Sequence, residues 1–157
     1  MDDLAIARAV HVLAIVHWIG GVSMVTLVLL PGLSRAVKAA ERMSLFGNIE
    51  GRFGNQARIS TALAGLSGLY MVYGMDVWDR FADPSYWWMH AMVLVWAIFT
   101  FMLFVAEPFF LHRWFDARAA RDPEGTFRRV QRMHVVLLTL SAITVAGAVL
   151  GAHGAFL

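Results

Sequence analysis

Four apolar stretches, separated by short charged segments, dominate this 157-residue chain. A helix needs about 20 apolar residues to cross the hydrocarbon core of a bilayer, and three of the stretches reach that length. The second reaches it only if Arg58 lies at the interface, where its long side chain can extend toward water. Charged residues make up 15% of the chain, against about 25% in a typical soluble domain. We therefore predict an all-α integral membrane four-helix bundle, with helices over residues 7–30, 57–74, 86–111 and 133–152.

The positions of the basic residues predict how this bundle is oriented. Of the 13 Lys and Arg residues, all except Arg8 and Arg80 lie in residues 35–58 or 113–132. Loops rich in Lys and Arg stay in the cytoplasm, so both termini are expected outside (N-out/C-out). This placement is a topology signal, so nucleic acid is not expected as a partner. Residues 33–53 are amphipathic and are predicted to form a cytoplasmic loop along the inner membrane surface.

The whole chain, residues 1–157, is predicted to be a single transmembrane domain in the lipid bilayer. We expect a multi-pass protein of a bacterial inner membrane. The acidic start Met1-Asp2-Asp3 lacks the basic region of a signal peptide, so the first apolar stretch is expected to be retained as a helix.

Two histidines are the first candidates for a cofactor site, because polar groups inside a membrane are costly and usually functional. His11 lies about one turn inside the outer end of the first helix, and His90 lies at the matching depth in the third. Two imidazoles at one depth can ligate a haem iron from opposite faces, so we predict haem b between them. Trp18 and Trp87 are expected to line the site. His17 lies about 120° around the helix from His11, as an alternative ligand, a propionate contact or a proton carrier.

A second group of polar residues lies near the predicted cytoplasmic ends of the helices. Arg58 opens the second helix and Glu107 lies near the end of the third. Pairing the two would lower the cost of burying either charge, so a structural ion pair is expected. The alternative is a proton-entry route or a second metal site formed by Glu107, His112 and His134. The chain has no cysteine, which excludes thiolate ligands.

The first helix carries a motif with a family resemblance. His11 is followed seven residues later by Trp18 and then by Gly20 and Gly21, whose small size could admit a flat ring. This stretch resembles the first helix of the bacterial four-helix membrane protoporphyrinogen oxidases, which implies that His11 is a haem ligand. The third helix of that family opens with an aromatic residue and a lysine, and His90 takes the place of the lysine here. The chain is also similar in outline to the copper-resistance D membrane family.

Three functions remain open from the sequence. The first is a b-type haem protein that transfers electrons or acts as an oxidoreductase on a small quinol or porphyrinogen, with a quinone or porphyrin as partner. The second is the handling of copper or another metal ion by the outward-facing His11, His90 and His153. The third is a cofactor-free structural or interaction protein that forms a homodimer through small residues of the second helix. These small residues are Ala62, Ala64, Gly65, Ser67 and Gly68.

Overall fold

The computed structural model describes residues 3–155, apart from the side chains of His112 and Asp116. These described residues are almost entirely helical and contain no strand, which confirms the all-α prediction. The elements in chain order are α1 (Asp3–Met24), the π-helix η1 (Val25–Leu29), α2 (Leu30–Ala36), α3 (Ala39–Gly74), the 3-10 helices η2 (Trp78–Phe81) and η3 (Pro84–Tyr86), α4 (Trp87–Phe101), the π-helix η4 (Met102–Leu111), α5 (His112–Ala119) and α6 (Pro123–Ala152).

Three continuous helical segments are long and apolar enough to cross a membrane. They are Asp3–Ala36, Pro84–Leu111 and Pro123–Ala152, with 34, 28 and 30 residues. At about 1.5 Å per residue, each is longer than the roughly 30 Å hydrocarbon core. The fourth long helix, α3, has 36 residues, but its first half is charged and its second half is rich in Gly, Ser and Thr. Three apolar helices therefore support a bilayer environment for this protein.

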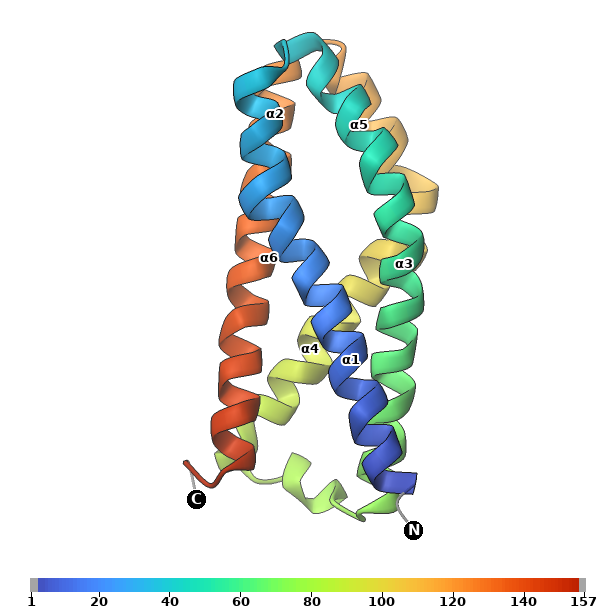
Figure 1. Cartoon of the computed structure of the whole chain (residues 1–157), viewed down its shortest axis with the longest axis vertical. Coiled ribbons are helices and arrows are strands. Elements are labelled where there is room, and N and C mark those ends of the chain that lie inside the picture. Colours follow the sequence, from blue (N-terminus) through green and yellow to red (C-terminus); the bar gives the residue numbers. More distant parts are fainter. Residues whose placement is uncertain (1–2, 156–157) are drawn as a thin grey trace.

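The two ends of the molecule differ in chemistry. The first residues of α1 and the last of α6 lie at one end, together with η2 and η3 (Figure 1). We call this the terminal end. The turns at residues 37–38 and 120–122 lie at the other end, close to most of the Lys and Arg residues. We call this the basic end.

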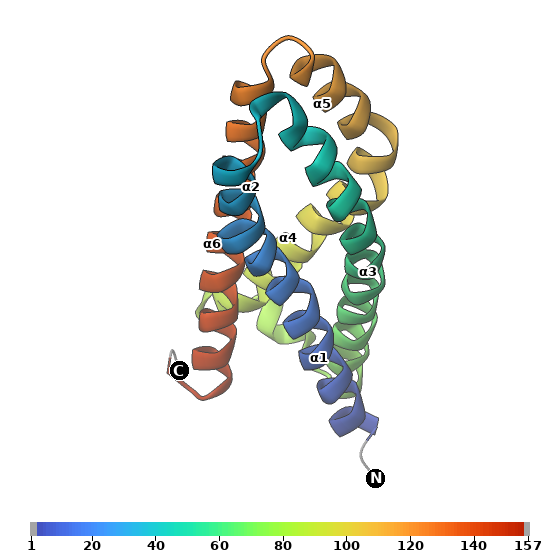
Figure 2. The same ribbon diagram turned by 45° about the horizontal axis from the view of Figure 1, so that its top comes forward.

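The helices α1 and α4 follow opposite diagonals between α3 and α6. The helix α1 begins beside α3 and continues through η1 and α2 to lie beside α6 at the basic end (Figures 1 and 2). The helix α4 begins beside α6 and continues as η4 toward α3. The two diagonals meet near the middle, where the rings of Trp18 and Phe99 pack edge to face with centroids 4.8 Å apart. This crossing decides which side of the bundle each terminal-end residue occupies.

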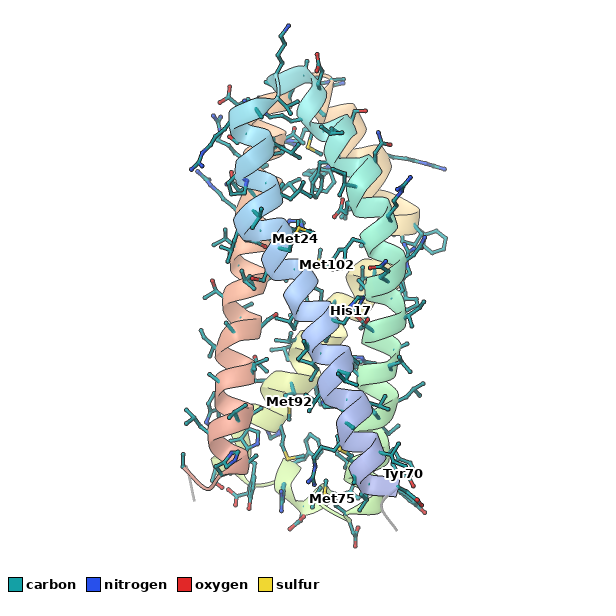
Figure 3. The ribbon with its side chains drawn as sticks, viewed as in Figure 1. His17, Met24, Tyr70, Met75, Met92 and Met102 are labelled. Carbon is teal, nitrogen blue, oxygen red and sulfur yellow. The ribbon has the colours of Figure 1, made fainter. Side chains whose placement is uncertain are left out.

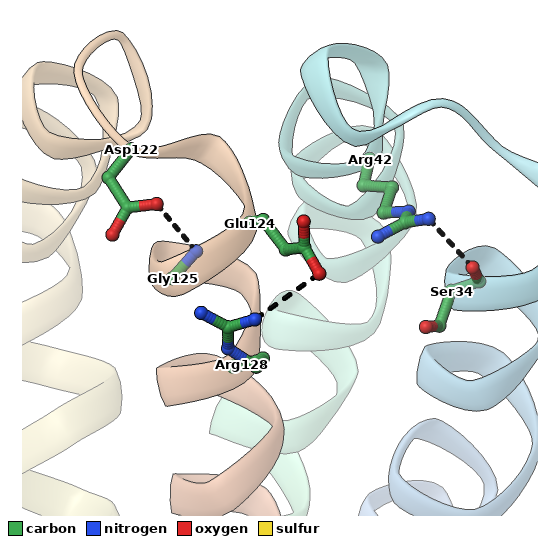
Figure 4. Close-up of polar contacts among 6 residues, drawn as sticks. All are labelled: Ser34, Arg42, Asp122, Glu124, Gly125 and Arg128. Atoms are coloured by element: carbon green, nitrogen blue, oxygen red, sulfur yellow. Dashed lines mark hydrogen bonds and ion pairs between the residues drawn. The ribbon is translucent and has the colours of Figure 1, made fainter.

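Polar contacts fix the turns at the basic end (Figure 4). The Asp122 carboxylate accepts the backbone N–H of Gly125 at 2.8 Å, which caps the start of α6. Arg42 donates to the carbonyls of Ser34 and Val37, so it satisfies acceptors at the end of α2. Its guanidinium also lies 5.7 Å from the centre of the buried Phe127 ring. These contacts hold the α2–α3 hairpin against α6.

The structure corrects two predicted boundaries. The helix expected over residues 57–74 begins at Ala39, so most of the predicted interfacial loop 33–53 belongs to α3 and its start belongs to α2. Hydrophobicity marks where a helix can be buried, but the polar residues 39–56 contain no proline to interrupt the helix. The helix expected over 133–152 likewise begins at Pro123, a favoured first helical residue.

Candidate functional site

A cavity of about 110 Å³ lies between α1, α3, α4–η4 and α6. We call this cavity the chamber. Most of its wall is apolar, but it also contains two carboxylates, an imidazole and the indole of a tryptophan. A water molecule needs roughly 10–15 Å³ of such space, so the chamber has room for several. Its lining includes Trp18, Phe46, Gly47, Glu50, Phe53, Gly54, Ala57, Phe99, Met102, Glu107, Met133, His134 and Leu137.

Both π-helices border the chamber, through Val25 of η1 and Met102 (labelled in Figure 3), Leu103 and Glu107 of η4. A π-helix carries one extra residue per turn and is often found at functional sites. The two helices that cross the bundle therefore have an irregular, wider backbone where they border the cavity. This irregular backbone lies next to the polar residues of the chamber.

Arg58 and Glu107 form the predicted ion pair at the chamber wall. Their side chains approach to 3.3 Å and are 29% and 16% exposed. Arg58 also donates from Nε to the carbonyl of Leu103 at 2.9 Å and from Nη1 to Asn55 at 2.8 Å. In a π-helix that carbonyl would accept the N–H of residue 108, but Pro108 has none. Arg58 thus replaces a backbone donor while it neutralises a carboxylate.

His134 and Glu50 form a second polar pair in the chamber. The Nδ1 of His134 lies 2.9 Å from the carbonyl of Val130, and because a carbonyl only accepts, Nδ1 carries a proton. The free position is Nε2, which lies 3.9 Å from Oε1 of Glu50. That distance is too long for a direct hydrogen bond and suits a bridging water. Glu50 is 36% exposed and His134 12%, so Glu50 forms the outer edge of the chamber.

Trp18 lines the inner part of the chamber. Its side chain is 4% exposed, yet its Nε1–H has no hydrogen-bond partner among the described residues. Most buried indole N–H groups are paired. Trp96 shows the ordinary arrangement, because its Nε1–H donates to the carbonyl of Thr61 at 2.9 Å. Trp18 therefore keeps a buried donor that the described residues leave unpaired.

His11 packs into the contact between α1 and α3. Its Nδ1 lies 2.9 Å from the carbonyl of Ala64 and 3.2 Å from the hydroxyl of Ser67. A Cβ atom on Gly68 would lie 3.1 Å from the His11 ring, so the glycine makes room for the imidazole. The carbonyl fixes a proton on Nδ1 and leaves Nε2 with a lone pair, which is the usual arrangement of a metal-ligating histidine.

His90 occupies a different side of the bundle from His11. Its Nε2 lies 3.0 Å from the carbonyl of Phe81, and its ring packs edge to face on Phe81 at 5.6 Å. Because α4 begins beside α6 while α1 begins beside α3, matched depth does not bring these rings together. The prediction of a haem held between this pair therefore gains no support from the arrangement.

The other residues predicted around a haem pack against protein. Trp87 lies against Gly147 of α6. A Cβ on Gly21 would collide with the Phe53 ring, whereas one on Gly20 would meet nothing. His17 lies on the exposed face of α1 (Figure 3). The predicted flat-ring site at the two glycines is therefore filled, at Gly21, by an aromatic side chain of α3.

The predicted second metal site of Glu107, His112 and His134 lies only partly within the described structure. No group of three His, Asp or Glu side chains there is close enough to hold a metal ion. Glu107 and His134 both line the chamber, while the side chain of His112 lies outside the described part of the structure.

Glu50 was not among the residues predicted from the sequence, because it belongs to a segment expected to be a surface loop. A carboxylate four residues after Phe46, on the same helical face, was the available signal.

The small residues of α3 pack against other helices of the same chain. Ala64 is buried, a Cβ on Gly65 would lie 2.6 Å from the Trp96 ring, and Gly68 accommodates His11. The small residues predicted to pack against another helix thus contact two helices of the same molecule, α1 and α4. They offer no support for a homodimer through this face.

Comparison with known proteins gives no further assignment. Neither the protein-family models, nor the curated proteins, nor the solved structures contain a match to this chain.

Proposed function

We propose that this protein takes up protons at one side of a membrane and holds them inside the bundle, as proton-coupled carriers and oxidoreductases require. The observation that carries the proposal is the pair formed by His134 and Glu50 at the edge of the chamber. Histidine is the side chain whose charge changes most readily near neutral pH. Ionisable groups inside membrane bundles commonly mark proton pathways.

The two ionisable pairs of the chamber have different roles in this proposal. The guanidinium of Arg58 lies 3.3 Å from Glu107 and holds that carboxylate in a fixed ion pair. His134 holds one proton on Nδ1, because the carbonyl of Val130 accepts it, and binds the incoming proton on Nε2. Glu50 is partly exposed, so it passes protons between solvent and that nitrogen, through water across the 3.9 Å gap.

In this proposal the basic end faces the cytoplasm, so protons are taken up from that side. The basic end carries most of the Lys and Arg residues, and such segments stay in the cytoplasm. The proposal is N-out/C-out in an inner membrane, with α3 as the fourth crossing.

The chain has no native cysteine, so single introduced cysteines can report topology. A cysteine replacing Ala120 should react with an impermeant thiol reagent only from the cytoplasm, and one replacing Ser85 only from outside.

Nuclear magnetic resonance of ¹⁵N-labelled histidine in lipid bilayers tests the proton site. We expect the Nε2 of His134 to gain a proton reversibly as the pH falls, while Nδ1 stays protonated throughout. The His134→Gln variant assigns the signal. His153 is the matched control, because it caps the C-terminal end of the same helix with its Nδ1 2.7 Å from the carbonyl of Val149 but lies outside the chamber lining. A His134 ring that stays neutral, or that loses the Nδ1 proton, would contradict the proposal.

Haem binding is the second candidate, and one observation favours it. His11 has its Nδ1 on a carbonyl and its Nε2 free, which suits a single axial ligand. An absorption spectrum of the purified protein, air-oxidised and then reduced with dithionite, decides it. A Soret band that disappears in His11→Ala supports haem. Stoichiometric copper without porphyrin would support metal handling instead. Folded protein that is colourless and metal-free would exclude both and leave the proton site as the remaining candidate.

A further inference from the structure

His17 is a polar residue on the outer face of α1, well inside a segment long and apolar enough to cross a membrane. It follows Arg8 by nine residues, which places it about 14 Å further along the helix axis. It is exposed and has no hydrogen-bond or ion-pair partner among the described residues. An imidazole is too short to reach water from this depth, so in a bilayer His17 would face hydrocarbon at a cost in free energy.

Other polar side chains of the long helices find partners within the chain. Thr139 is also exposed, but its hydroxyl donates to the carbonyl of Val135 in its own helix at 2.8 Å. His11, on the same helix as His17, lies 2.9 Å from the carbonyl of Ala64 on α3. The His17 ring makes neither kind of contact, so a partner for it has to come from outside the described residues.

The exposed residues around His17 form a straight stripe along α1, which lies on an outer face of the bundle in both ribbon views (Figures 1 and 2). They alternate at intervals of four and three residues, the spacing of a helix that packs lengthwise against another helix. We call them the α1 stripe: Ile6, Val10, Leu13, His17, Gly20 and Met24. Gly20 leaves the backbone open, because a Cβ there would meet no atom within 4 Å.

We propose that the α1 stripe is the contact between two copies of this protein, packed as parallel helices with the two His17 rings facing each other. Two copies in one membrane share one orientation, so each residue of the stripe meets its own counterpart at the same depth. A neutral imidazole has one N–H donor and one acceptor nitrogen, so one His17 can donate to the other. Gly20, one turn away, lets the two backbones approach closely.

This contact is separate from the chamber. The residues of α1 that line the chamber are Trp18 and Val22, and neither belongs to the α1 stripe. A single polar residue in an apolar helix contact also fixes the register of the two helices. His17 is therefore a positioning residue of the dimer and not part of the proton site, and the two proposals can fail independently.

Crosslinking of single cysteines in lipid vesicles tests the contact, because the chain has no native cysteine. Leu13→Cys places a thiol in the α1 stripe, and Leu66→Cys places one on α3 as a matched control. The two leucines are 68% and 67% exposed and lie at similar distances from the terminal end. We expect a disulfide-linked dimer from Leu13→Cys after oxidation, and only the level of random collision from Leu66→Cys.

Energy transfer between labelled copies, measured as lipid is added, gives the dissociation constant of the dimer. His17→Leu should weaken association about three- to fifteen-fold, the loss expected for one hydrogen bond between membrane helices. His17→Gln keeps a donor and an acceptor and should stay within about twofold of the native value. Gly20→Leu should weaken association about tenfold or more by separating the helices. Gly51→Leu is its control, because a Cβ on either glycine meets no atom within 4 Å.

The outcomes separate this proposal from the proposed function. Native protein that stays monomeric in vesicles, equal crosslinking at the two cysteines, or an unchanged dissociation constant in folded His17→Leu would overturn the α1 contact. If His134 still gains a proton under those conditions, the proton site stands without the dimer. If the dimer forms through the α1 stripe while His134 stays neutral, the dimer stands and the proposed function fails.

Discussion

The Arg58–Glu107 pair allows a quantitative prediction, because the chain contains a second arginine–glutamate pair of nearly the same length in a different environment. The partly buried pair is 3.3 Å apart with side chains 29% and 16% exposed. Glu124 and Arg128 are 3.2 Å apart with side chains 61% and 60% exposed. At 3.3 Å two unit charges attract by about 1.3 kcal/mol in water and about 5 kcal/mol at an effective dielectric constant of 20. The partial burial of Arg58 places its coupling to Glu107 at about 1–3 kcal/mol.

The exposed pair should contribute much less. Pairs four residues apart on an open helix surface contribute about 0.3–0.5 kcal/mol, because water screens the charges and the side chains lose rotamer freedom. Arg58→Gln should also cost more than Glu107→Gln. It removes the hydrogen bonds to Leu103 and Asn55 together with the ion pair, and a bond from a charged donor contributes about 1.5–3 kcal/mol.

Two double-mutant cycles measure these coupling free energies. Each cycle compares both single glutamine variants and the double variant with the native protein. Unfolding in mixed micelles with increasing sodium dodecyl sulfate, followed by circular dichroism, gives the free energies. Equal coupling in the two cycles would refute the reasoning that burial in the chamber wall strengthens the Arg58–Glu107 pair.

Three further variants test the packing of the bundle by the same unfolding assay. Gly65→Leu should destabilise by about 1–3 kcal/mol through overpacking, because a Cβ there lies 2.6 Å from the Trp96 ring; a stability equal to the native value would exclude this contact. Gly54→Ala should be less stable than Gly51→Ala, because only the Gly54 Cβ would approach a carboxylate oxygen, at 3.2 Å; the reverse order would contradict the chamber geometry. Asp122→Ala should cost about 1 kcal/mol as the loss of a helix N-cap, and an unchanged stability would show that the cap is not formed.

The sequence indicated how far along a helix each residue lies better than it indicated which neighbouring helix that residue faces. The all-α fold follows from apolar runs, and the pairing of Arg58 with Glu107 follows from opposite charges at the same end of neighbouring helices. His11 and His90 were likewise expected at matching depth. Their separation depends on the opposite diagonals of α1 and α4, which place one beside α3 and the other beside α6. The crossing depends on packing between helices distant in sequence, and no local pattern encodes it.

The chamber could not be located from local patterns for a related reason. Glu50 belongs to a polar half of α3 that resembles a surface segment. The residues that line the chamber with it come from α1, η1, α4, η4, α5 and α6. The π-helices that widen α1 and α4 next to the cavity have no simple composition signal, although Pro108 identifies a carbonyl that needs a substitute donor. Trp18 was expected to line a haem site, which stays a prediction; its burial and its unpaired N–H are visible only once its neighbours are known.

The most direct test of the account is the side from which His134 exchanges protons. The protein is reconstituted in vesicles with one orientation, established by the single cysteines in the turns, and the pH is changed on one side at a time. Infrared or ¹⁵N spectroscopy then follows protonation of the ring. The account predicts that His134 responds to the pH at the basic end and not to the pH at the terminal end. A response only from the terminal end, or no response from either side, would contradict it.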